Sequence, residues 1–286
     1  MLHLSPEYSK ILKGEIRIMI DKIAGYVRRC VDDYNMVEQG ETIAVGVSGG
    51  KDSMVLLCAL ASLARYHPKQ FKVHAVTLDM GFEANMDGLA EQGDSPVALS
   101  SIGEDRGSGL SPCSEKLSPF NPIKELCDEL GVPFTLKRSE IASVVFEHRK
   151  EKNPCSLCAT MRRAALCNMV KELGINKIAL AHHYDDAIET FMLSLLYEGR
   201  ISCFQPVTYL DRTEVTQIRP MIYVEEKTII NYVKAENIQI VKNPCTMNGV
   251  SKREEVKTLL KTLGIEHRDI KSKIFGAIQR LPIKGW

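Results

Sequence analysis

Short apolar runs alternate with amphipathic segments along most of the chain. Strands are expected over residues 41–47, 73–79, 131–137 and 177–182, where aliphatic and β-branched residues cluster. Helices are expected over residues 51–66, 123–130, 160–173 and 185–197, where apolar residues recur at helical spacing. Strands and helices that alternate in this way form right-handed βαβ units. The pattern predicts an α/β fold with a parallel, doubly wound sheet.

The flanking segments predict the domain organisation. Residues 1–40 form an N-terminal helical segment, with Ser5 as N-cap and Pro6 at the first helical position. Residues 41–204 form the α/β domain. Within it, residues 86–122 are rich in Ser, Gly, Asp, Glu and Pro, and we expect a disordered insertion there. Residues 205–286 are expected to form a C-terminal appendage that includes a basic helix.

Composition narrows the class of protein. The chain has 286 residues, of which 44% are hydrophobic and 26% are charged, as in ordinary globular proteins. The sequence has no run of 18 apolar residues and therefore predicts no membrane span. Its N-terminus lacks the apolar core of a signal peptide. We therefore expect a cytoplasmic protein without a membrane partner.

Charge is unevenly distributed although the net charge is only +1. Residues 79–129 carry a net charge of −8, and residues 252–286 carry +5. The basic C-terminal segment can bind a polyanion, although a solvated helix face explains the same count.

The strongest chemical signal is Ser48-Gly49-Gly50-Lys51-Asp52-Ser53, between a predicted strand and a predicted helix. Glycines let the backbone turn its amides toward an anion, and the helix N-terminus adds a positive dipole. Lys51 adds a full charge, and the two serines add hydroxyl groups. The alternative, a glycine-rich turn that merely starts a helix, does not explain why these features coincide.

A second polar block, residues 181–190, follows the strand at residues 177–182. Asp185, Asp186 and Glu189 can hold Mg²⁺, which prefers carboxylates and phosphate oxygens. The block also contains two histidines, His182 and His183, which can contact a nucleotide or move a proton. An acidic first helical turn that complements the helix dipole is the alternative interpretation.

The nine cysteines fall into different groups, and one of them, Cys113, lies within the expected insertion. Five lie singly in apolar stretches and are expected to be small buried residues in a reducing compartment; they are Cys30, Cys58, Cys127, Cys167 and Cys203. Cys155 and Cys158 form a CxxC, and Cys245 follows another Asn-Pro pair. Thiolates of a CxxC can share one metal centre. A zinc site, a persulfide or disulfide relay, and unrelated buried thiols are alternatives.

Three motifs carry a resemblance to a known family. The hexapeptide at residues 48–53 resembles the PP-loop signature of the ATP pyrophosphatase superfamily. The HHxDDxxET block resembles tRNA lysidine synthetases and tRNA 2-thiocytidine synthetases. The CxxC, followed by Thr160-Met-Arg-Arg163, resembles the 2-thiocytidine synthetase family. The insertion and the segment after Cys245 depart from that family and leave the exact substrate in doubt.

The resemblance implies an ATP-dependent tRNA sulfurtransferase in which Lys51, Asp52 and the three cysteines are catalytic. It implies that Cys155, Cys158 and Cys245 bind a [4Fe–4S] cluster with one iron open for sulfide. The C2 oxygen of a cytidine in the anticodon loop of tRNA would be adenylated and then replaced by sulfur. The other implied ATP ligands are Ser48, Gly49, Gly50, Ser53, Asp79, His182, His183 and Asp186, with Mg²⁺.

The resemblance also implies partners. Arg162 and Arg163, which closely follow the CxxC, are candidates for contact with tRNA phosphates, although a solvated helix face is an alternative. A cysteine desulfurase or another sulfur donor is an expected partner, and a homodimer is an expected assembly. Two other functions stay open. One is a PP-loop ligase or thiolase that acts on another nucleoside or small molecule, and the other is a nucleotide-binding regulator.

Overall fold

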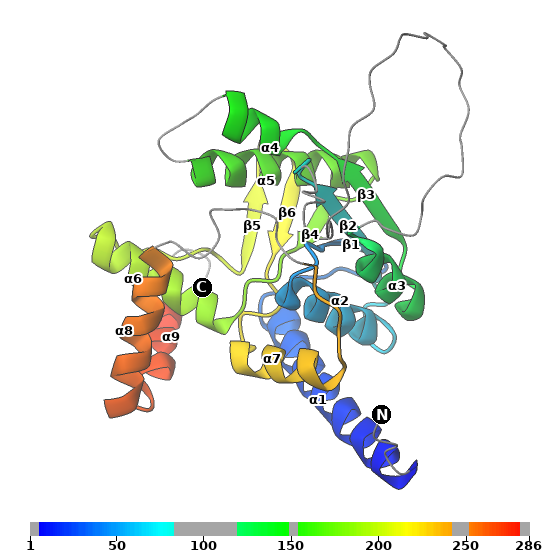
Figure 1. Ribbon diagram of the computed structural model, residues 1–286, viewed down its shortest axis with the longest axis horizontal. Coiled ribbons are helices and arrows are strands. Elements are labelled where there is room, and N and C mark those ends of the chain that lie inside the picture. Colours follow the sequence, from blue (N-terminus) through cyan, green and yellow to red (C-terminus); the bar gives the residue numbers. More distant parts are fainter. Residues whose placement is uncertain (1–5, 83–118, 149–153, 242–251, 281–286) are drawn as a thin grey trace, which may run out of the picture.

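A computed structural model describes residues 6–82, 119–148, 154–241 and 252–280 (Figure 1). The strands in these residues are β1 (Thr42–Gly46), β2 (Lys72–Asp79), β3 (Phe134–Arg138), β4 (Lys177–Ala179), β5 (Val207–Leu210) and β6 (Val215–Ile218). The longer helices are α1 (Pro6–Asp33), α2 (Lys51–Ala64), α3 (Asn121–Leu130), α5 (Pro154–Glu172), α6 (Tyr184–Tyr197), α7 (Glu226–Ala235), α8 (Lys252–Glu266) and α9 (Ile270–Arg280). A short helix α4 (Ile141–Ser143) continues into a π-helical stretch, Val144–His148.

These strands form one sheet in the order β3-β2-β1-β4-β6-β5. Every pairing is parallel except that of the edge strand β5 with β6. The central strand β1 pairs with β2 on one side and with β4 on the other. The chain therefore leaves β1 toward one edge of the sheet and later returns on its other side. This arrangement confirms the predicted parallel α/β fold.

Alternation along β1 distributes the core between the two faces of the sheet. Ile43 and Val45 belong to the core that includes buried residues of α1, α2 and α7. Ala44, on the opposite face, packs with buried residues of α5. Helices cover both faces, as Figure 1 shows with α5 on one side of the sheet and α1, α2 and α7 on the other.

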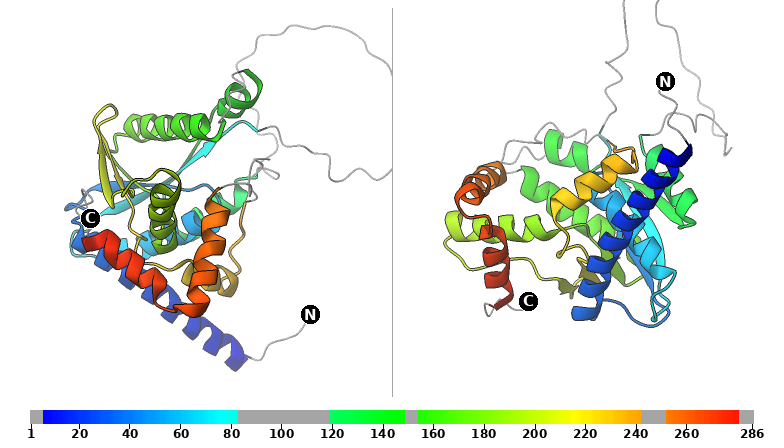
Figure 2. Two further views of the ribbon diagram at one scale, coloured as in Figure 1. Left: turned by 90° about the vertical axis from the view of Figure 1, so that its left-hand side faces the viewer. Right: turned by 90° about the horizontal axis from the view of Figure 1, so that it is seen from below.

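The sheet continues beyond residue 204, after which the sequence pattern predicts a separate appendage. β6 pairs in parallel with β4, and the pair β5 and β6 completes the sheet at that edge. α8 and α9 lie outside the sheet and pack against α6 around Ala187, Val256 and Phe275 (Figure 2). The C-terminal segment therefore contributes both to the sheet and to a helical layer beside it.

Some expectations fall wholly or largely outside the described residues. The N-cap Ser5, Cys245 and most of the insertion at residues 86–122 are among them. None of the described helices combines the length and apolarity that a membrane crossing requires.

Most of the cysteines that were expected to be buried are buried in the structure. Cys30, Cys58, Cys127 and Cys167 are buried, and Cys203 is half-buried. Burial raises the pKa of Cys58 to about 12, because a thiolate would lose its hydration there. These side chains are packing groups and not reactive thiolates.

Candidate active site

The glycine-rich turn follows β1 at the carboxyl edge of the sheet. Gly49 has φ of +80°, a conformation that residues with a Cβ rarely adopt. A Cβ at this position would lie 2.5 Å from Cβ of Val241. The Val241 N–H also donates to the Gly49 carbonyl at 3.0 Å. Backbone conformation and close packing thus both require glycine here.

Two serines hold the turn in shape. The Ser53 hydroxyl donates to the Gly50 carbonyl at 2.9 Å and accepts from the Ser48 N–H at 3.2 Å. The Ser48 and Ser53 Oγ atoms are 3.3 Å apart. α2 begins at Lys51, so the turn leads into a helix N-terminus, where backbone amides are available for an anion.

A pocket of about 330 Å³ opens beside this turn. It lies where the carboxyl ends of β1, β2 and β4 meet, with α5 along one side. Its lining combines apolar side chains with a few polar groups, as in nucleotide sites. The lining residues are Gly46, Val47, Ser48, Gly50, Asp52, Ser53, Val76, Leu78, Arg162, Leu166, Leu180, Ala181, His182 and Asp186.

Asp79 lies next to the pocket, at the end of β2. Its Oδ1 accepts a hydrogen bond from the Gly81 N–H at 2.9 Å, so the carboxylate stabilises the turn after the strand. Leu78, the preceding residue, lines the pocket.

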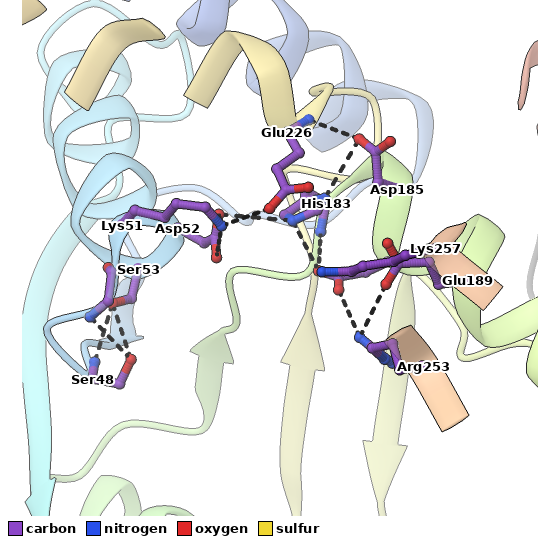
Figure 3. Close-up of polar contacts among 12 residues, drawn as sticks. Ser48, Lys51, Asp52, Ser53, His183, Asp185, Glu189, Glu226, Arg253 and Lys257 are labelled. Carbon is purple, nitrogen blue, oxygen red and sulfur yellow. Dashed lines mark hydrogen bonds and ion pairs between the residues drawn. The ribbon is translucent and has the colours of Figure 1, made fainter. Parts of the chain in front are cut away.

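The Lys51 ammonium is directed toward α7. Its Nζ lies 2.9 Å from Oε1 of Glu226 and 3.0 Å from Oδ1 of Asp52 (Figure 3). Burial alone would lower the pKa of Lys51, but the hydrogen bonds to both carboxylates raise it above its ordinary value. Lys51 is therefore fully charged and neutralised by two acids.

His183 is the N-cap residue of α6 and lies among carboxylates. Its backbone N–H donates to Oδ2 of Asp186 at 3.1 Å. Its ring nitrogen Nε2 lies 3.4 Å from the same oxygen and 3.7 Å from Oδ1 of Asp52. The histidine thus links the acid after β1 with the acid after β4.

Asp185 is directed away from the pocket. Its Oδ2 accepts from the Glu226 N–H at 2.7 Å, and its Oδ1 accepts from Nζ of Lys271 on α9. Burial would raise the pKa of this carboxyl group, but these hydrogen bonds lower it below its usual value. Asp185 therefore joins α6 to α7 and α9.

Arg253 of α8 makes a second connection to α6. Its Nη1 lies 2.8 Å from Oδ1 of Asp186 and 3.7 Å from Oε2 of Glu189, and its Nη2 donates to the Thr190 hydroxyl at 3.2 Å. Glu189 is only 4% exposed, and burial raises its pKa to about 7.

The structure does not bring together the three acids considered for Mg²⁺. Asp185 faces Lys271, whereas Asp186 and Glu189 face Arg253. In the part of the chain that the structure describes, no three His, Cys, Asp or Glu side chains are grouped as a metal site. Asp186 alone of the three lines the pocket.

His182 is half-buried, and its ring lies beside that of Phe204, with ring centroids 5.0 Å apart. The Arg219 guanidinium lies 5.1 Å from the centre of the same phenyl ring. Burial, reinforced by the positive charge of Arg219, lowers the pKa of His182 to about 4. The pocket therefore contains a neutral imidazole.

The CxxC lies within a helix, since α5 begins at Pro154 and not near residue 160. Cys155 is exposed and Cys158 is half-buried, and both are thiols. Residues 155, 158, 162 and 166 are three or four positions apart and share one helix face. Because Arg162 and Leu166 line the pocket, this face is directed toward the nucleotide turn. Cys158 precedes Arg162 by about 6 Å along the helix axis.

The two arginines of α5 have different surroundings. Arg162 and Arg163 are both exposed, but only Arg162 is part of the pocket lining. Burial lowers the pKa of the Arg219 guanidinium, and the positive charge of Arg163 lowers it further. Arg163 is therefore the arginine of this pair that lies outside the pocket lining.

Three charged residues of the site were not predicted individually: Glu226, and Arg253 and Lys271 of the basic segment at residues 252–286. They come from α7, α8 and α9, outside every motif. Helix-start patterns could have placed Glu226 in a first helical turn. No sequence signal indicated that these residues contact the motifs after β1 and β4.

The fold and the site define this chain as an α/β protein of the PP-loop class. A model of the PP-loop domain matches residues 109–262, more than half of the chain, including the CxxC and the block at residues 181–190.

Comparison with curated relatives identifies the family within the PP-loop class. The tRNA-cytidine(32) 2-sulfurtransferase of Geobacter metallireducens is 32% identical over 90% of this chain and 88% of its own length. That of Bordetella petrii is 32% identical over 91% of this chain and 71% of its own length. The chain belongs to the tRNA-cytidine(32) 2-sulfurtransferase family of PP-loop proteins.

A solved structure has the same fold. The U34-tRNA thiolase NcsA from Methanococcus maripaludis, described with its [4Fe–4S] cluster, matches with a TM-score of 0.67. The match covers 93% of this chain and 79% of that chain at 20% sequence identity.

Substitution of Gly49 tests the packing of the turn. Gly49→Ala should lower the free energy of unfolding by about 2–4 kcal/mol and weaken nucleotide binding, because it combines an unfavourable φ with a clash at Val241. Gly50→Ala is the matched control for stability, since Gly50 has φ of −72° and a Cβ there would meet only Ser48 Oγ at 3.5 Å. Denaturant unfolding and calorimetric ATP binding measure both effects. Equal losses of the free energy of unfolding in the two variants would contradict this description of the turn.

The neutral state of His182 predicts a pH dependence of stability. The pKa rises from about 4 in the folded protein to the ordinary 6.5 on unfolding, so the unfolded chain binds more protons between these values. Stability due to this group is complete above pH 6.5 and is lost as pH falls toward 4, by about 2 kcal/mol between pH 7 and 5. Between pH 7 and pH 5, the His182→Gln variant should lose less free energy of unfolding than wild type, by about the contribution of this group. Urea unfolding of both proteins at pH 7 and at pH 5 tests this prediction. Equal losses of stability in wild type and in His182→Gln would contradict the low pKa of His182.

Proposed function

We propose that this protein is an ATP-dependent tRNA sulfurtransferase that replaces the C2 oxygen of a cytidine with sulfur. The relatives named tRNA-cytidine(32) 2-sulfurtransferase support this substrate. The observation that carries the proposal is the arrangement of α5. One face of this helix bears Cys155 and Cys158 and, one turn further, the pocket-lining Arg162. Sulfur chemistry and nucleotide chemistry can thus meet at one place.

ATP is proposed to bind with its phosphates at the turn of residues 48–53. Backbone amides at the start of α2 and the Lys51 ammonium would offset the phosphate charge. The cytidine O2 would attack the α-phosphate and expel pyrophosphate, so that AMP becomes the leaving group at C2. His182 and His183 are proposed to contact the nucleotide, and Asp79 its ribose or adenine.

The position of Arg162 suggests a role different from tRNA binding. Because its side chain lines the pocket, we assign it to the phosphates of ATP or of the adenylated cytidine. Arg163, exposed and outside the lining, remains the candidate for tRNA phosphate contact.

Mg²⁺ is proposed to accompany ATP. Asp52 and Asp186 both line the pocket, and Mg²⁺ is commonly held by one or two carboxylates together with substrate phosphates. They therefore fit this ion, which would neutralise charge on the phosphates. Asp185 and Glu189 are directed to other partners and are better suited to hold α8 and α9 in place.

An iron–sulfur cluster is proposed at Cys155 and Cys158, with Cys245 as the third ligand. The two described cysteines fit such a group, because they are accessible thiols one helical turn apart. With three protein ligands, a [4Fe–4S] cluster would supply an iron able to carry sulfide to the activated carbon. A cysteine desulfurase or another sulfur donor, a homodimeric assembly and a cytoplasmic location belong to the same proposal.

Substitution of the α5 cysteines tests this assignment. Protein purified without oxygen should contain roughly four irons and four labile sulfides, and Cys155→Ala or Cys158→Ala should lose them while retaining ATP binding. Cys167→Ala, on the same helix but buried in the core, should retain the iron.

The iron content and the ATP affinity are measured on the same samples. Iron-free wild-type protein that still releases pyrophosphate with tRNA would favour a PP-loop ligase instead. Iron that survives both substitutions would place the cluster elsewhere.

A further inference from the structure

Lys51 is the cationic residue of the glycine-rich turn, yet Lys51 is not among the residues that line the pocket. The turn contributes Ser48, Gly50, Asp52 and Ser53 to that lining. The Lys51 ammonium instead contacts Glu226, 2.9 Å away on α7 (Figure 3). The Lys51 and Glu226 side chains are 28% and 29% exposed, so solvent only partly screens this pair.

Glu226 is held in place independently of its carboxylate. It is the first residue of α7, and its backbone N–H donates to Oδ2 of Asp185 at 2.7 Å. Asp185 is in turn paired with Lys271 of α9. The Glu226 carboxylate is therefore presented to Lys51 by a fixed backbone.

We propose that Glu226 is a positioning residue that holds Lys51 away from the phosphates when the nucleotide site is empty. The inference rests on the proposed use of ATP at this site. Lysine has a long flexible side chain, so its ammonium can exchange one carboxylate for another anion without backbone movement. A triphosphate carries several negative charges and competes effectively with a single carboxylate for the ammonium.

This exchange has a consequence for turnover. ATP binding must break the ion pair between Lys51 and Glu226, and that cost weakens the binding of both ATP and pyrophosphate. When pyrophosphate leaves, Glu226 recaptures the ammonium and opposes rebinding. Glu226 therefore favours product release, and removing its charge should make the phosphate site bind more tightly.

A simpler effect would also tighten phosphate binding when the charge of Glu226 is removed, so the test must distinguish it from competition for Lys51. The negative charge of Glu226 could act by direct repulsion of phosphate, without Lys51. Direct repulsion would persist when Lys51 is replaced by Met, whereas competition for the ammonium would not. A double-mutant cycle distinguishes the two.

The test is calorimetric binding of ATP and of inorganic pyrophosphate to the full-length protein at low ionic strength. Glu226→Gln keeps the backbone hydrogen bond to Asp185 and should bind pyrophosphate five- to twentyfold more tightly than wild type. Glu225→Gln is the control, because Glu225 is the exposed neighbour that precedes α7, and it should change affinity less than twofold. In the Lys51→Met background, Glu226→Gln should also change affinity less than twofold. The tightening should shrink in 0.5 M salt.

The outcomes separate this inference from the proposed function. If wild type binds ATP but Glu226→Gln binds pyrophosphate equally or more weakly, only the role of Glu226 is overturned. An equal tightening in the Lys51→Met background would also overturn it, in favour of direct repulsion. Wild-type protein that binds neither ATP nor pyrophosphate would overturn both proposals.

Discussion

The position of β1 between β2 and β4 is the constraint on which the site depends. All three strands run parallel, so their carboxyl ends meet at one edge of the sheet. The chain departs from β1 in one direction and returns on the other side, which leaves a crevice at this point of reversal. The turn after β1 and the block after β4 are 131 residues apart when measured from Gly50 to Ala181, but strand pairing makes them neighbours.

Charge balance is the second feature that organises the site. Acids lie in and around the pocket, and each has a cationic partner. Lys51 lies between its neighbour Asp52 and Glu226 of α7, and Arg253 of α8 pairs with Asp186 of α6. A bound triphosphate with Mg²⁺ would alter several of these pairs at once. Binding is therefore expected to be an exchange of ion pairs, and the helices that contribute the cations influence the affinity for the nucleotide.

The sequence predicted those parts of the fold that depend on local pattern. The strands of the parallel core, the helix after the glycine-rich turn and the helix after the His-His block follow from hydrophobic periodicity and from glycine position. The hairpin of β5 and β6 was assigned to an appendage, because two four-residue strands give a weak signal, and parallel pairing of β6 with β4 is a long-range property. The start of α5 was placed too late, although Pro154 is a residue typical of a first helical position.

The sequence predicted the motifs of the site better than their partners. Ser48, Asp52, His182 and Asp186 were expected at a nucleotide site, and all four line one pocket. Glu226, Arg253 and Lys271 were missed, because their roles arise from how α7, α8 and α9 pack against α6. The same packing explains why the three acids predicted as Mg²⁺ ligands, Asp185, Asp186 and Glu189, all meet cationic side chains. Local pattern specifies which residues follow a strand, whereas tertiary packing specifies which charges they meet.

The most direct test of the account is a nucleoside analysis of the reaction product. Protein purified without oxygen is incubated with ATP, inorganic sulfide and unmodified tRNA, and the digested tRNA is analysed by mass spectrometry. The account predicts 2-thiocytidine, formed only with ATP and accompanied by equal amounts of AMP and pyrophosphate, and absent with Lys51→Met or Cys158→Ala. Consumption of ATP with a cytidine modified by a group other than sulfur, or 2-thiocytidine formed without ATP, would contradict it.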